Sequence, residues 1–244
     1  MRGYDGSSYG DGMADVYDEW YAAPADTDAC VATLARLADG GPILELGAGT
    51  GRLAIPLARL GLEVHALDGS ADMLRRLAEK PGGSDVHCHV GDMAGALPDG
   101  LFRLVFVAVN TFFGVLDENA QRCAMQSIAD RLPAGGRFVM EAFVPDAQQD
   151  GDRIEVRDLA ADRVVLSISR TDASAQQAIG QFVELRDGQP VRLRPWAIRW
   201  ATVEQLDDMA GRAGLAVEAR WATWNGTEFD SDSVNHVTVY RRES

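Results

Sequence analysis

The stretch "ILELGAGTGRLAIPLARLGLEVHALDGSADML", residues 43–74, places a glycine-rich turn between an apolar strand and a helix. Gly47, Gly49 and Gly51 follow the spacing G-x-G-x-G, and glycine there allows positive φ angles and a close approach of a ligand to the backbone. The helix that follows offers free N–H groups and a partial positive charge. Asp68 ends the next strand, where its carboxylate can accept two ribose hydroxyls. The pattern therefore predicts a loop that binds a nucleoside cofactor.

Strands and helices alternate on both sides of this loop. We predict strands at residues 43–46, 62–67, 84–90, 102–109 and 135–144, and helices at residues 50–60, 70–80 and 117–132. Such alternation is typical of an α/β, Rossmann-like fold whose mostly parallel sheet carries helices on both faces. Pro56 lies inside the first of these helices and predicts a kink or an irregular start there.

The pattern changes after residue 145, because residues 146–198 show strands and turns without helical periodicity. We expect these residues to form an antiparallel β insertion. The core then resumes, with the capping-box spacing of Thr202 and Gln205 before a helix and two final strands that pair antiparallel. The predicted division is a Rossmann-like domain of residues 1–145 and 199–244, interrupted by the insertion.

Composition limits the partners of the chain. It has 23 Lys and Arg against 37 Asp and Glu, a net charge of −14. Binding to nucleic acid or to an anionic membrane needs clustered basic residues, so we expect neither partner. A small-molecule acceptor remains, and the insertion offers a surface for a homodimer. The three cysteines have no C-x-x-C spacing and the first residues lack the apolar stretch of a signal peptide, so we expect a cytoplasmic protein.

A dinucleotide cofactor is the main competing interpretation of the glycine turn. Its fingerprint reads G-x-G-x-x-G, but Arg52 occupies the position of the third glycine, and no second mononucleotide-binding half follows. A nicotinamide-dependent (NAD) oxidoreductase therefore stays an alternative that the glycine turn alone does not remove.

Four motifs in order carry a resemblance to a known family. They are "LELGAGTGRLA" (residues 44–54), "ALDGSADML" (66–74), "VGDM" (90–93) and "LPAGGRFVMEAF" (132–143). Together they resemble the class I S-adenosylmethionine (SAM) dependent methyltransferases, EC 2.1.1, over most of the chain. The added strands are similar to those of enzymes that methylate amino sugars and other natural-product intermediates. The resemblance implies methyl transfer to an amine or hydroxyl of a small molecule, and a non-catalytic SAM-binding module is the alternative.

The resemblance also implies where the cofactor binds. Gly47 and Gly49 should line its methionine and ribose portion, while Glu45 helps to hold the amino end. Asp68 should accept the ribose hydroxyls, Met73 should lie beside the adenine, and Asp92 should accept from the adenine amino group. Asn110, at the end of the fourth strand, should face the methionine end. The implied cofactor-binding residues of the motifs and strand ends are Glu45, Gly47, Ala48, Gly49, Asp68, Gly69, Met73, Asp92, Met93 and Asn110.

The N-terminal segment, residues 1–30, is rich in aromatic side chains. Tyr9, Tyr17, Trp20 and Tyr21 lie on a predicted helix before the core. In related small-molecule methyltransferases such a segment closes over the cofactor, and aromatic rings also suit a sulfonium by cation–π attraction. We expect Tyr9, Tyr17 and Trp20 to contribute to the cofactor site, although a plain docking helix is the alternative.

Few polar side chains are candidates for proton transfer. Glu141 ends the fifth strand and His236 begins the last one, so both are expected at the edge of the sheet that carries the cofactor. The alternative for Glu141 is a role as a salt-bridge partner, and the alternative for His236 is a half-buried structural histidine. His87 and His89 share one face of a strand, but they lack an evident third ligand, so we predict no metal site. The sequence Asn110-Thr111-Phe112-Phe113 lacks the proline pair typical of enzymes that methylate DNA or glutamine.

Overall fold

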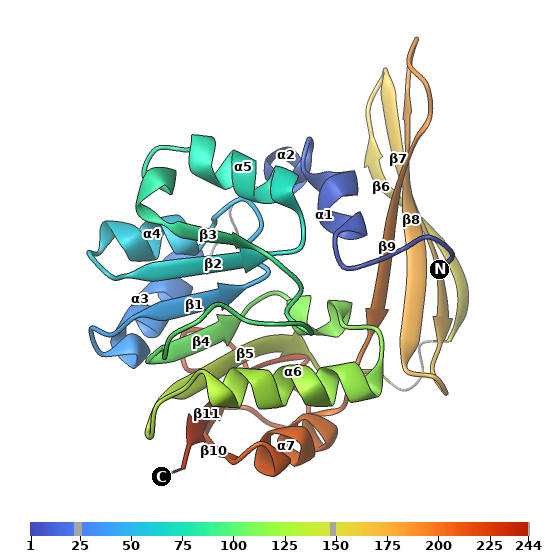
Figure 1. Cartoon of the computed structure of the whole chain (residues 1–244). Coiled ribbons are helices and arrows are strands. Elements are labelled where there is room, and N and C mark those ends of the chain that lie inside the picture. The colour runs from blue at the N-terminus through green and yellow to red at the C-terminus, as the bar shows by residue number, and fades with distance from the viewer. Residues whose placement is uncertain (22–25, 147–149, 244) are drawn as a thin grey trace.

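A computed structural model describes residues 1–21, 26–146 and 150–243, which contain two separate β-sheets (Figure 1). The larger sheet has seven strands in the order β10-β11-β5-β4-β1-β2-β3. Its strands are β1 (Ile43–Leu46), β2 (Val64–Asp68), β3 (His87–Val90), β4 (Leu104–Val107), β5 (Arg137–Phe143), β10 (Leu215–Trp221) and β11 (Asn235–Arg242). The first five are parallel, whereas β11 runs antiparallel to both β5 and β10. The predicted fold class is confirmed.

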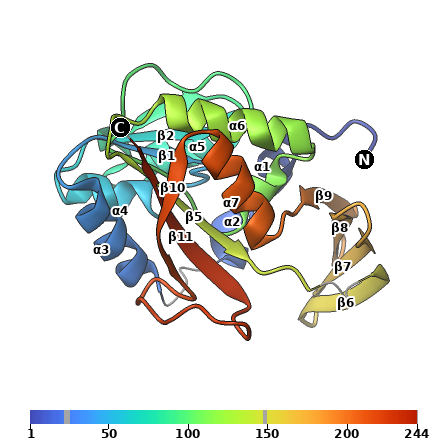
Figure 2. The same cartoon turned by 90° about the horizontal axis from the view of Figure 1, so that it is seen from below.

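Helices cover both faces of this sheet. The helices are α1 (Ser8–Met13), α2 (Tyr17–Trp20), α3 (Thr27–Ala38), α4 (Ala54–Arg59), α5 (Ala71–Glu79), α6 (Glu118–Asp130) and α7 (Val203–Arg212), with 3₁₀ turns η1 (Gly83–Asp85) and η2 (Thr111–Gly114). Side chains of α3, α4 and α5 form one apolar core with one face of the sheet, and side chains of α6 and α7 form a second core with the other (Figure 2). Burial on both faces explains why β1 and β4 have no exposed residue.

The smaller sheet is an antiparallel meander, which we call the lid sheet. Its strands are β6 (Gly151–Leu159), β7 (Arg163–Asp172), β8 (Gln177–Arg186) and β9 (Arg192–Arg199). Helices α1 and α2 lie between the lid sheet and the core (Figure 1). The predicted antiparallel β insertion is confirmed, and it follows directly from β5, at the carboxyl edge of the parallel strands.

Local details agree with the sequence except at two helices. The predicted helix over residues 50–60 begins only at Ala54, because residues 50–53 form turns. Pro56 then lies in the first turn, where its missing N–H leaves no hydrogen bond unmade, so the start is irregular and no kink is needed. The single N-terminal helix expected to carry Tyr9 and Tyr17 is two short helices, α1 and α2, separated by three residues.

Candidate functional site

The glycine loop joins β1 to α4. The N–H groups of Gly47 and Ala48 both donate to the carbonyl of Leu67 on the neighbouring strand, at 2.7 and 3.1 Å. Gly47 has a φ angle of 71°, and a Cβ built on it would lie 2.2 Å from the Thr111 methyl carbon. A side chain at this position would therefore push the loop away from the turn that follows β4, so the close approach requires glycine.

Asp68 connects the glycine loop to the end of β2. One of its carboxylate oxygens accepts from the Gly49 N–H at 2.8 Å, and the other accepts from the Ser70 N–H at 2.8 Å. Burial raises the pKa of this carboxyl above its usual range. Each carboxylate oxygen can accept more than one hydrogen bond, so both can still receive a ribose hydroxyl.

Glu45 supplies a second, fully buried acid beneath the loop. It accepts from the Ala54 backbone N–H, but its Oε2 atom has no hydrogen-bond partner among the described residues. Burial raises the pKa of Glu45 to about 8. A buried carboxyl that lacks a partner is unfavourable by itself and becomes favourable when a cation binds beside it. This is the chemistry that the amino group of SAM requires.

The other end of the candidate site, which we call the cleft, lies between α5 and the turn after β3. Met73 is buried against α1, and Asp92 accepts from the Ala94 N–H through one carboxylate oxygen. The backbone of Gly6 packs so closely that a Cβ on Gly69 would lie 2.6 Å from its carbonyl oxygen. A Cβ on Gly47 would lie 3.7 Å from the Met93 methyl, so Met93 borders both ends of the cleft.

The N-terminal aromatic residues converge on this cleft. The Tyr17 ring lies 3.9 Å from the Cβ position of Gly49, and its centroid is 4.9 Å from that of Tyr21. The Tyr9 hydroxyl is 3.3 Å from the Tyr21 hydroxyl. Trp20 instead meets Phe182 of the lid sheet edge to face, at 5.9 Å between centroids. Tyr17 is thus the aromatic side chain next to the glycine loop, and burial raises its pKa to about 12.

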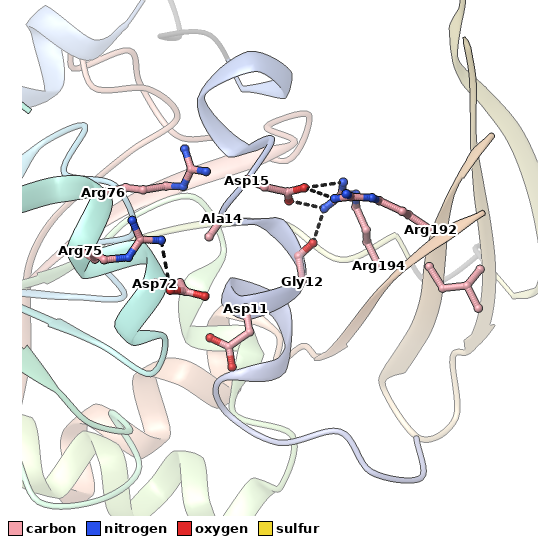
Figure 3. A pocket seen from close by; sticks show the side chains of 10 residues that line it. Asp11, Gly12, Ala14, Asp15, Asp72, Arg75, Arg76, Arg192 and Arg194 are labelled. Carbon is pink, nitrogen blue, oxygen red and sulfur yellow. Dashed lines mark hydrogen bonds and ion pairs between the residues drawn. The ribbon is translucent and has the colours of Figure 1, made fainter. Parts of the chain in front are cut away.

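Ion pairs hold the N-terminal segment on both sides, and the sequence contained no signal for them. Asp18 accepts from the Thr50 hydroxyl at 2.5 Å and pairs with Lys80 at 2.8 Å, which ties α2 to the core. Asp15 pairs with Arg194 of β9 (Figure 3). Arg194 also pairs with buried Glu184 at 2.8 Å. Because these partners are far apart in the chain, only the folded structure brings them together.

One cavity lies away from the glycine loop. It has a volume of about 390 Å³ and lies among α1, α5 and β9, with mostly charged side chains around it (Figure 3). Asp15 and Arg194 border it, and on its opposite side Asp72 pairs with Arg75 at 3.2 Å. Most of the charged side chains around the cavity pair with one another. We therefore interpret it as the outer edge of the contact that α1 makes with α5 and β9.

Of the two candidates for proton transfer, Glu141 already accepts hydrogen bonds and His236 is buried. Glu141 accepts from the Val109 N–H at 2.9 Å, and the side chain of Trp224 donates to it as well. His236 is 1% exposed, and its Nδ1 atom lies 2.9 Å from the Thr238 hydroxyl. Burial, reinforced by the charge of Arg220, lowers the pKa of His236 to about 4.

The strand histidines form a small cluster at the edge of the sheet. His65 Nδ1 lies 3.0 Å from His89 Nε2, and the His65 ring centroid is 4.8 Å from that of His87. Among residues 1–21, 26–146 and 150–243, no group of three or more His, Cys, Asp or Glu is arranged to hold a metal ion. The same residues include no helix long and apolar enough to cross a membrane.

This cleft fits SAM on three counts. The glycines admit a ligand to the backbone, Asp68 presents carboxylate oxygens, and Glu45 offers an unpartnered buried oxygen to an amino group. The fold and the site together define a nucleoside-binding methyltransferase of the Rossmann-like class. The methyltransferase domain family matches residues 43–136. The chain belongs to the SAM-dependent methyltransferases, and SAM is its cofactor.

Similar proteins support this membership. The CcbJ methyltransferase from Streptomyces caelestis has a solved structure that is 37% identical, with a TM-score of 0.91 over 99% of this chain and 100% of that chain. The cypemycin N-terminal methyltransferase from a Streptomyces species is 29% identical over 85% of this chain and 86% of its own. The sugar N-methyltransferase KedS8 from a Streptoalloteichus species shares the fold, with a TM-score of 0.73 and 19% identity over 100% of this chain and 99% of that chain. Nothing in these comparisons favours the oxidoreductase or the non-catalytic module.

Proposed function

We propose that the protein transfers the methyl group of SAM to an amine nitrogen of a small molecule in secondary metabolism. When bound, SAM supplies an electrophilic methyl group on a sulfonium, which an amine lone pair can attack directly. The observation that carries the choice of amine is that Glu141 already accepts from two N–H groups and that His236 is 1% exposed, so neither is presented to an acceptor as a base. A neutral amine needs no base before the attack and releases its proton to water afterwards, whereas a hydroxyl needs one. The relatives named for N-terminal and sugar N-methylation agree with this proposal.

The residues of the chain would then act mainly by binding and orienting. We propose that Glu45, Asp68 and Asp92 hold the cofactor at its amino, ribose and adenine groups, and that the remaining residues expected from the sequence line the same cleft. The positions of Tyr17 at the loop and of Tyr9 beside Tyr21 support an aromatic cover. Orientation and the exclusion of water can supply several kcal/mol of the catalytic effect.

We propose that residues 1–145 and 199–244 act as the cofactor-binding domain, with residues 1–30 as its cover, and that residues 146–198 cover the acceptor. The inner face of the lid sheet carries Phe182 and Trp196, whose centroids lie 6.3 Å apart. Both pack against the N-terminal segment, which itself lies on the cleft. This placement at the carboxyl edge of the sheet is where acceptors approach in open α/β folds.

A matched pair of acceptors tests the choice of amine. The protein is incubated with methyl-labelled SAM and with a set of amines, each beside the alcohol of the same carbon skeleton. Label should appear in amines only, and the rate should rise with pH through the pKa of the amine. Transfer to the alcohols at equal rates would contradict the proposal.

We further propose that the protein is a homodimer that pairs through the outer face of the lid sheet. Ile154, Val156 and Leu193 lie on this face with 70%, 62% and 61% of their surfaces exposed. Four strands of eight to ten residues, at about 3.3 Å per residue and about 4.8 Å between strands, give a footprint of roughly 600 Å². The side chains make the accessible surface larger than this flat footprint. The area that the dimer would bury therefore approaches the roughly 800 Å² per partner of a stable interface. A sheet face can pack on its own copy about a two-fold axis.

A further inference from the structure

The turn between β4 and η2 has an unusual backbone. Val109 and Asn110 are consecutive non-glycine residues with φ angles of 50° and 63°. Asparagine adopts this left-handed conformation with some ease, but for a β-branched residue such as valine it is an outlier. A strained conformation persists only where surrounding contacts hold it, and such strain is concentrated at functional sites.

Three hydrogen bonds from the end of β5 hold this turn. Glu141 Oε2 accepts from the Val109 N–H at 2.9 Å, and the Glu141 carbonyl accepts from the Asn110 N–H at 3.2 Å. The Asn110 side-chain oxygen accepts from the Phe143 N–H at 2.7 Å. The only one of the three that depends on a charged side chain is the bond from Val109 to Glu141.

The turn also presses on the glycine loop. Thr111 closes the turn by donating its hydroxyl to the Ala108 carbonyl at 2.7 Å, and its methyl group occupies the space that a Cβ on Gly47 would need. The position of the turn therefore sets the position of the loop. A relaxed Val109 would move Thr111 and loosen the contact with Gly47.

We infer that Glu141 is a positioning residue, whose carboxylate holds the strained Val109–Asn110 turn against the glycine loop, and that it is not the proton acceptor of the reaction. The inference rests on the cofactor-binding role of that loop. Its other donor, Trp224, is buried, so the carboxylate is held between two N–H groups. The Val109 N–H requires an acceptor, which the oxygen of a neutral amide also supplies, although the NH2 of that amide would then face Trp224.

Two substitutions separate positioning from a role of the charge. Glu141→Gln keeps a side-chain oxygen for the Val109 N–H, whereas Glu141→Ala removes it. Val109→Gly lets the turn adopt positive φ without strain, and because Val109 is 51% exposed it leaves no buried cavity. Binding of S-adenosylhomocysteine, measured by calorimetry, reports on the glycine loop without any acceptor.

We expect Glu141→Ala to weaken S-adenosylhomocysteine binding by about tenfold and to remove the exchange protection of the Val109 amide in NMR. Glu141→Gln should stay within about threefold of the wild type. Adding Val109→Gly to Glu141→Ala should restore affinity to within about threefold of Val109→Gly alone. Glu218→Ala is the matched control, because Glu218 bonds to Arg137 at the opposite end of β5 and should not change the affinity.

Equal losses for Glu141→Gln and Glu141→Ala would overturn the inference, because the oxygen that Glu141→Gln keeps for the Val109 N–H would then contribute nothing to the position of the loop. Failure of Val109→Gly to restore binding would also overturn it. The Glu141→Gln comparison remains decisive where Glu141→Ala does not fold. A wild-type protein that does not bind S-adenosylhomocysteine would instead refute the proposed cofactor site and the inference with it.

Discussion

Strand β1 of the core sheet is buried along its whole length, whereas strand β6 of the lid sheet has eight of its nine residues exposed. The core sheet is covered by helices on both faces, and its central strands β1 and β4 are therefore buried at every residue. The inner face of the lid sheet packs against the N-terminal segment and, through Ala178, against the core. The core owes its order to local patterns and apolar burial, and the lid combines a smaller apolar contact with long-range polar contacts.

Breaking the buried ion pair of Arg194 should give the largest effect among the tests of this difference. Arg194 is 3% exposed and pairs with Asp15 and with buried Glu184. Arg194→Met leaves Glu184 with only its contact to Arg186 at 3.3 Å, and removing one member of a buried pair costs up to about 3–5 kcal/mol. We expect that loss in the free energy of unfolding, measured with urea.

Arg192→Met is the matched control for Arg194. Arg192 also pairs with Asp15 from β9, but its side chain is mostly exposed. An exposed pair contributes about 0–1 kcal/mol, so the control should stay in that range. Equal losses for the two variants would mean that burial of the pair is unimportant and that the lid is not held as we describe.

A substitution of Asp68 tests the cofactor site at the edge of the core sheet. Asp68→Ala removes both the oxygens that accept from Gly49 and Ser70 and the proposed ribose acceptors. SAM binding should weaken by more than tenfold, above about 1.4 kcal/mol. Calorimetry measures it, and Asp72→Ala, an exposed acid on α5, should leave the affinity alone. An unchanged affinity in Asp68→Ala would remove the ribose assignment.

Glu45 predicts a pH dependence of the ligand-free protein. Its folded pKa of about 8 lies above the ordinary value of 4.5, so the folded state binds more protons between these values. Stability should therefore fall as pH rises from about 5 to about 8, by at most about 1.4 kcal/mol per pH unit. Glu45→Gln should remove this slope.

The same group predicts proton release on binding. A cationic amino group beside Glu45 favours the carboxylate, so SAM should release roughly one proton at pH 7. Calorimetry in buffers of different ionisation enthalpy measures this number. No proton release, with tight binding retained, would place the amino group away from Glu45.

A substitution on the outer face of the lid sheet should have the smallest effect on the free energy of unfolding. Leu193→Glu changes an exposed side chain, so the unfolding free energy of the monomer should change by less than about 0.5 kcal/mol. The proposed dimer should nevertheless dissociate, because charges opposed across a two-fold axis repel. Light scattering after gel filtration measures the mass, and Leu60→Glu, an exposed leucine at the end of α4, is the control. A wild-type monomer would refute the dimer.

The cofactor half of the site was largely predictable from the sequence. The glycine loop, Asp68 and the Ser70 cap all depend on residues within about 25 positions of one another, and turn and cap preferences act at that range. The parallel sheet with helices on both faces followed from the alternation of strands and helices. The two short N-terminal helices were predicted wrongly as one, because no local signal marks the break between them.

What only the tertiary structure decided involves partners that are distant in the chain. Arg194 finds Asp15 across 179 positions, and Glu141 finds Val109 across 32. Such contacts leave no periodic pattern in the sequence. The role of a charged side chain, or of a strained φ angle, can be inferred only when the residue that it contacts is known. The sequence by itself determined the class of cofactor, a nucleoside, through the spacing of the glycine loop and Asp68, and it indicated SAM through the resemblance of four ordered motifs to the SAM-dependent methyltransferases. The folded structure decided how the cleft is covered and what holds its edge, since burial sets the strength of each polar contact there.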